Sequence, residues 1–212
     1  MRHPTSIYEV LLIVAIFAGW FIYSSFQAVV AGFPAPTMGE GSALGLVLLE
    51  GMAFLAAAGV LYARGWKVQD FFFRLSWLRT FAGLLLFGAA LLVHFAVWEL
   101  LGGLVAARSF VAEFAQSVSL TLPVALLVSV VNGAYEEFFL TRYLISALSA
   151  SGAAIAIGVS ALVRLMYHLY QGPVGALSVV GFGLVVSVFY WRYREIWPVM
   201  FAHMFADFVA LV

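Results

Sequence analysis

The sequence predicts an all-α fold: a polytopic transmembrane helix bundle of about seven spans. Of its residues 65% are hydrophobic and only 9% are charged, and the mean hydropathy is +1.09. A soluble domain usually has about 25% charged residues, so this composition indicates a polytopic membrane protein. Each span needs roughly 20 residues, and the 212 residues therefore allow a single bundle of about six to eight helices.

Charge and cysteine content exclude several classes of function. The formal net charge is zero, which argues against nucleic acid as a partner and against a polybasic lipid-binding tail. The chain has no cysteine. Disulfides, thiolate catalysis and cysteine-based metal sites are therefore excluded.

The N-terminal half contains three expected spans, over residues 7–30, 42–62 and 80–101. The first is longer than the ~7–15 apolar residues of a signal-peptide core, and further spans follow it. A basic loop over residues 64–79 separates the second span from the third. Its aromatic residues predict a segment that lies at the membrane interface.

The C-terminal half contains four more expected spans, over residues 120–147, 153–170, 176–190 and 198–212. The fourth span of the chain is longer than a bilayer requires. A turn of small residues near position 150 follows it, so the fourth and fifth helices are expected to form an antiparallel hairpin.

The positive-inside rule predicts the orientation of this bundle. With seven spans, Arg2, the basic loop and the turn with Arg192 and Arg194 fall on one side. That side is expected to be cytoplasmic, together with the N-terminus. The opposite side receives Glu40, Arg108, Glu113 and Gln171.

Charged residues interrupt the apolar fourth span at Glu136, Glu137 and Arg142. In hydrocarbon each charged side chain costs roughly 2.5–3.5 kcal/mol, so three in one stretch indicate a functional site. At a rise of 1.5 Å per residue, the hairpin places His168 within about 5 Å in height of Glu136. Arg164 is then nearly level with Glu137.

The last span adds a second polar pair. His203 and Asp207 are four residues apart and so share one face of a helix. Together with Glu136 and His168 they form a candidate site below the cytoplasmic surface. A partly desolvated carboxylate can act as general base for water, with a histidine beside it and a second polar pair at the oxyanion.

A metal site is the alternative chemistry. Two histidines and two carboxylates are ligand types that bind Zn²⁺. The usual HExxH spacing is absent, so this alternative depends on residue types alone.

At these residues the sequence resembles the CPBP family of CAAX proteases and bacteriocin-processing enzymes, also called the Abi family. The family has an EExxxR motif, an FxxxH motif and a final Hxxx(N/D) motif on successive transmembrane helices. Glu136 and Glu137 match the first motif, His168 the second, and His203 with Asp207 the third. The resemblance covers roughly residues 131–212. We expect one integral membrane domain over residues 1–212, with a protease core at about 117–212 and N-terminal spans within 7–101.

The resemblance implies an intramembrane endopeptidase of the glutamic type, with no cofactor. Glu136 and His168 would activate water, and His203 and Asp207 would stabilise the oxyanion. Glu137 would pair with the arginine of the first motif. The implied partners are a membrane protein or peptide as substrate and the lipid bilayer, with no oligomeric state indicated. Short loops suggest, by analogy, a bacterial inner-membrane protein.

Two departures from the family pattern affect the supporting residues Glu137, Arg164 and Arg142. Thr141 occupies the arginine position of EExxxR, and Arg142 follows one residue later, rotated by about 100° on a helix. Arg164 replaces the phenylalanine of FxxxH. We infer that Arg164 supplies the counter-charge for Glu137, and that Arg142 snorkels near a helix end. Asp207, unlike asparagine, donates a hydrogen bond only when protonated.

Two other functions stay open. A proteolytically inactive family member could act as an immunity, scaffold or regulatory membrane protein, and Thr141 favours this alternative. A proton-coupled transporter would use the glutamates and histidines as a relay, but no inverted repeat is evident. Glu50, His94 and Glu99 lie within expected spans and match no motif, so we expect them to pair structurally or to line the cavity.

Overall fold

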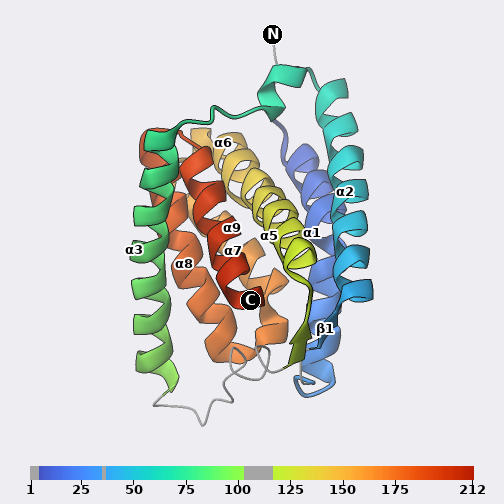
Figure 1. Ribbon diagram of the computed structural model, residues 1–212. Coiled ribbons are helices and arrows are strands. Elements are labelled where there is room, and N and C mark those ends of the chain that lie inside the picture. The colour runs from blue at the N-terminus through green and yellow to red at the C-terminus, as the bar shows by residue number, and fades with distance from the viewer. Residues whose placement is uncertain (1–4, 35–36, 103–116) are drawn as a thin grey trace.

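Long apolar helices make up the structure, a computed structural model that describes residues 5–34, 37–102 and 117–212 (Figure 1). Its all-α architecture confirms the predicted fold class. Arg2, Arg108 and Glu113, which entered the topology prediction, lie outside the described residues.

The N-terminal half supplies α1 (Ile7–Val30), α2 (Glu40–Ala63) and α3 (Trp77–Gly102). Each is long and apolar enough to cross a membrane. Many of their large apolar side chains are exposed in the isolated chain, as is expected for helices that face lipid. A 3₁₀ turn (Val68–Phe71) lies between α2 and α3.

The C-terminal half begins with a span that changes its helix type. α5 (Leu122–Glu136), a π-helical segment (Glu137–Tyr143) and α6 (Leu144–Ala147) follow one another without a break. Together they form the span predicted over residues 120–147. A 3₁₀ turn (Ser149–Ser151) leads from α6 into the next helix.

Three further helices complete the described chain. α8 (Gly172–Tyr193) follows a 3₁₀ turn (Leu169–Gln171), and the two together are long enough to cross a membrane. α7 (Ala153–Tyr167) and α9 (Trp197–Leu211) have 15 residues each, or about 22 Å. Among the described residues, five helices thus have crossing length, and two of the seven expected spans are shorter apolar helices.

α5 occupies the middle of the bundle (Figure 1). It packs against α2 on one side and α9 on the other, while α3 packs against α8 and α9. α5 and α9 approach very closely at Gly133, where a Cβ atom would lie 2.6 Å from the backbone nitrogen of Met204. Small residues permit such close helix contacts in membranes.

The basic segments that were predicted to share one side of the membrane lie at one end of the bundle. This end carries the loop between α2 and α3, the turn between α6 and α7, and the turn between α8 and α9 (Figure 1). At the opposite end, β1 (Met38–Gly39) pairs in parallel with β2 (Val118–Ser119), a contact that the sequence did not predict. The compartment that each end faces stays a prediction.

Candidate active site

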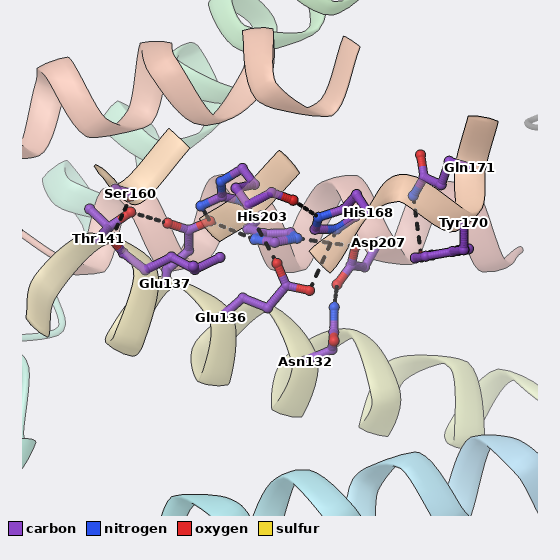
Figure 2. Close-up of polar contacts among 12 residues, drawn as sticks. Asn132, Glu136, Glu137, Thr141, Ser160, His168, Tyr170, Gln171, His203 and Asp207 are labelled. Atoms are coloured by element: carbon purple, nitrogen blue, oxygen red, sulfur yellow. Dashed lines mark hydrogen bonds and ion pairs between the residues drawn. The ribbon is translucent and has the colours of Figure 1, made fainter. Parts of the chain in front are cut away.

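Polar side chains from α5, the π-helical segment, α7 and α9 meet inside the bundle (Figure 2). Glu136 lies 14 residues after the start of its span at Leu122 and 11 residues before its end at Ala147. These separations correspond to about 21 Å and 17 Å. The cluster therefore lies near mid-depth, rather than immediately beneath one surface.

Glu137 is held on both of its carboxylate oxygens. Oε1 accepts hydrogen bonds from Arg164 Nη2 and from His203 Nδ1, each at 2.7 Å. Oε2 accepts a hydrogen bond from the hydroxyl of Thr141 at 2.5 Å. Both Glu137 and Arg164 are fully buried. The partners of this carboxylate come from three elements: α7, α9 and the π-helical segment.

The π-helical segment carries both Glu137 and Thr141. A π-helix has a wider turn than an α-helix and often occurs at functional sites. The wider turn changes the backbone bonding within the segment, and Ser160 of α7 donates to the carbonyl of Leu140 at 2.6 Å. The hydroxyl of Ser160 thus fixes α7 against the same turn that carries the glutamates.

Glu136 has a different environment from its neighbour. Its Oε2 has no hydrogen-bond partner among the described residues, and the nearest cation atom recorded, Arg164 Nη1, is 3.7 Å away. Its Oε1 lies 3.8 Å from Nε2 of His168. Both distances exceed that of a hydrogen bond, so the buried carboxyl of Glu136 keeps acceptor capacity.

His168 is oriented by the backbone of its own helix. Its Nδ1 lies 2.9 Å from the carbonyl oxygen of Arg164. A carbonyl only accepts, so Nδ1 carries the hydrogen and Nε2 of the neutral ring has a lone pair. That lone pair lies on the side of Glu136 (Figure 2).

A second chain of contacts joins α9 to α5. His203 Nδ1 donates to Glu137, and Nε2 of the same ring lies 3.5 Å from Asp207 Oδ1. Asp207 Oδ2 accepts a hydrogen bond from the amide of Asn132 at 2.9 Å. Asn132 is one turn before Glu136, so this chain returns to the same face of α5.

Arg142 does not join the cluster. Its guanidinium donates to the carbonyl of Phe72 at 3.0 Å and lies 5.6 Å from the ring centre of Phe138. These contacts tie the α2–α3 loop to the π-helical segment. The cation that faces Glu137 is instead Arg164, on the neighbouring helix.

The structure brings Glu136, His168, His203 and Asp207 together with Glu137 (Figure 2). Arg164 lies 2.7 Å from Glu137 and 3.7 Å from Glu136. Asn132 and Thr141 also belong to the cluster, and the sequence analysis did not predict them as site residues. Helical spacing could have found both, since each lies four residues from one of the paired glutamates. The catalytic roles of Glu136, His168, His203 and Asp207 stay predictions.

The described parts of the chain contain no group of three or more His, Asp or Glu side chains arranged to hold a metal ion. His168 already uses Nδ1 as a hydrogen-bond donor to the carbonyl of Arg164, and His203 uses its Nδ1 as a donor to Glu137. Residue types alone suggested the zinc alternative, and the described geometry does not assemble them as ligands.

Comparison with known proteins gives a match to a protein family. Residues 118–209 match the family model described as type II CAAX prenyl endopeptidase, Rce1-like. The match runs from β2 into α9 and so includes the cluster of Figure 2. It confirms the resemblance to the CPBP proteases for this part of the chain. Neither the curated proteins nor the solved structures gave a match.

Proposed function

We propose that the protein is an intramembrane endopeptidase. The premise is that residues 118–209 are Rce1-like and so similar to a family of membrane proteases. The unequal environment of two adjacent glutamates carries this proposal. Glu137 accepts three hydrogen bonds, whereas Glu136 Oε2 accepts none among the described residues. Glu137 orients the site, and Glu136 is the base.

Glu136 and His168 present two acceptors to a water molecule. One water proton passes to the Glu136 carboxylate, while the second O–H donates to Nε2 of His168. The water oxygen then bonds to the carbonyl carbon of the peptide. The proton on Glu136 passes to the amine nitrogen as the C–N bond breaks, which restores the carboxylate. General base catalysis of this kind contributes roughly 10²–10⁴-fold.

His203 and the Asn132–Asp207 pair stabilise the oxyanion. His203 Nδ1 lies 2.7 Å from Glu137 and Nε2 lies 3.5 Å from Asp207, so the ring is held between the two carboxylates beside Glu136. Asp207 accepts a hydrogen bond, whereas an oxyanion needs a donor. The amide of Asn132 has two N–H groups and supplies a donor at the place where Asp207 lacks one.

The substrate is a membrane-associated protein or peptide. The cluster lies near mid-depth in a bundle whose outer helices expose apolar side chains. A substrate that reaches this depth must itself be apolar or held at the membrane. We assign the enzyme to the bacterial inner membrane with its N-terminus in the cytoplasm, and we assign it no cofactor.

Cleavage of a fluorogenic peptide library by the purified protein in detergent tests the proposal. Glu136→Gln keeps the shape of the side chain and removes the base, so we expect a loss of about 10²–10⁴-fold. Glu195→Gln is the matched control, because this glutamate is only partly buried and pairs with Arg79 at the bundle end. Its rate should stay at the wild-type value.

A parallel run with EDTA separates the two chemistries. A glutamic protease keeps its activity under chelation, while loss of activity that zinc restores would show a metal enzyme. If the wild-type protein cuts no member of the library, the result would favour the alternative that the protein is a proteolytically inactive family member.

A further inference from the structure

Unpartnered buried polar atoms gather around Glu136. Seven buried side-chain nitrogen and oxygen atoms of the described residues lack a hydrogen-bond partner, and six of them belong to Glu50, Glu136, Arg164 and Tyr167. Buried polar groups in folded proteins are nearly always satisfied by protein or by water. A cluster of exceptions therefore marks a place with unused hydrogen-bonding capacity.

Glu50 is the member of this group that the proposed mechanism does not use. Both of its oxygens are unpartnered, and its side chain is fully buried. The structural pairing expected for Glu50 from the sequence is therefore wrong within the described residues. Its alternative, a place that lines the site, remains.

The position of Glu50 on α2 is not that of a snorkelling residue. It lies ten residues after Glu40 and thirteen before Ala63, at about 15 Å and 20 Å from the two helix ends. A glutamate cannot extend its carboxyl over such distances to an interface. The buried positions of α2 are Ala43, Glu50, Ala57 and Leu61.

α2 packs against α5, and Ala43 of this stripe lies in one buried apolar cluster with Ala125 and Val128 of α5. The small side chains of Ala43 and Ala57 allow close approach on both sides of Glu50. The charged groups of Glu136, and of His203 and Asp207 on α9, act electrostatically on the carboxyl of Glu50. The buried phenol of Tyr167 has no hydrogen-bond partner among the described residues, whereas the phenol of Tyr135 donates to the carbonyl of Phe17 at 2.7 Å.

Burial of Glu50 contributes nothing evident to the stability of the fold. An unpaired ionised carboxylate in a dry site is very costly, so the group is accommodated as the neutral acid. The neutral acid still has unsatisfied polar atoms, and replacing such a group by an apolar one of similar shape is often neutral or stabilising. An ionisable residue retained inside a membrane helix under these conditions indicates a function.

We propose that Glu50 is a positioning residue for Glu136, and that with Tyr167 it holds a water molecule against Glu136 Oε2. The neutral acid donates to this water, the phenol of Tyr167 shares it, and the water donates to Glu136. A buried water typically makes about three such bonds to otherwise unsatisfied groups. The free oxygen of Glu136 is thereby fixed, and the carboxylate is turned so that Oε1 faces His168. This inference rests on the proposed protease function.

The test compares Glu50→Leu, Glu50→Gln and the control Glu99→Leu, which removes an exposed glutamate from α3. Thermal unfolding in detergent and cleavage kinetics are measured for each. We expect Glu50→Leu to keep or raise the unfolding temperature while kcat falls by about tenfold or more and KM stays the same. Glu50→Gln retains a donor and should recover most of kcat, and Glu99→Leu should match the wild type.

Three outcomes would overturn the inference. An unchanged kcat in Glu50→Leu would show that the residue is idle. A lowered unfolding temperature in both variants of Glu50, with kcat lost in parallel, would show a structural role. A rise in KM without a change in kcat would place Glu50 in substrate binding.

An infrared titration keeps this inference separate from the proposed function, because it needs no substrate. The wild type should show the carbonyl stretch of a buried neutral carboxylic acid, and this band should vanish in Glu50→Gln. The titration of the Glu136 carboxylate, identified with Glu136→Gln, should shift in Glu50→Leu. Absence of the band, or an unshifted titration, would overturn the role of Glu50 even if the wild type cleaved nothing.

Discussion

Arg164 Nη2 lies 2.7 Å from Glu137 Oε1, and this buried ion pair joins α7 to the π-helical segment. The family pattern places the arginine on the helix of the glutamates, where this chain has Thr141. Thr141 donates to the other oxygen of Glu137, so the same carboxylate is held from two helices. The two departures from the family motifs thus meet at one residue.

Removing one partner of the Arg164–Glu137 pair should destabilise the fold strongly. A lone buried charge costs about 3–5 kcal/mol, so we expect losses of this size for Glu137→Gln and for Arg164→Gln. The double variant should lose less than the sum of the two. A double-mutant cycle of unfolding in detergent measures the difference.

The pair Arg79–Glu195 gives the control for this cycle. It has a similar separation of 2.7 Å, but its side chains are 27% and 41% exposed. Its coupling should be under about 1 kcal/mol, because water screens it. A coupling near zero for the buried pair as well would contradict our reading of the site.

Gly133→Ala should separate α5 from α9. The added Cβ would meet the backbone of Met204, which cannot move as a flexible side chain does. We expect destabilisation by about 1–3 kcal/mol, together with loss of cleavage because His203 would withdraw from Glu137. Thermal unfolding and kcat are the measurements.

Gly59→Ala is the matched control for Gly133→Ala. Position 59 lies within α2, and nothing lies within 4 Å of the place where its Cβ would be. Alanine in a helix interior is more stable than glycine by roughly 0.5–1 kcal/mol. The control should therefore be slightly more stable and fully active, and equal behaviour of the two variants would contradict the close-contact argument.

Arg142→Gln should leave catalysis nearly unchanged. The side chain contacts the carbonyl of Phe72 and the ring of Phe138, and it does not reach Glu137. Loss of a partly exposed cation–π contact costs about 1 kcal/mol, so a small decrease in unfolding temperature is expected. A fall in kcat as large as that of Arg164→Gln would contradict this prediction and show that Arg142 supports the active site.

Helix positions were predictable where apolar length alone decides them. α1 has the predicted bounds, and the ends of α2 and α3 differ from the prediction by one to three residues. A run of roughly 20 apolar residues can only be a spanning helix, because lipid satisfies no backbone group. The short fifth and seventh helices show the limit of this argument, since each has only 15 residues.

The relative heights of the site residues were predictable, but their contacts were not. Rise per residue placed Arg164 level with Glu137, since a hairpin fixes relative height. The π-helical segment changes the rotation of every residue after Glu137, and no composition signal marks where such a turn begins. The environment of Glu50 depends on the packing of α2 against α5, and its sequence position shows only that a carboxyl lies in an apolar helix.

Asn132 should be as important for catalysis as Asp207, because its amide is the donor beside the proposed oxyanion position. It donates to Asp207 Oδ2 at 2.9 Å and lies one turn from Glu136. Loss of one oxyanion donor costs about 10²–10³-fold in kcat, which we expect for Asn132→Leu. Asn132→Asp should be equally impaired, since it places two carboxyl groups side by side.

The exchange of both residues, Asn132→Asp with Asp207→Asn, restores one amide and one carboxylate and should recover most of kcat. Steady-state kinetics at saturating substrate compare the four proteins, and an exchange variant no better than Asn132→Asp would remove Asn132 from the mechanism.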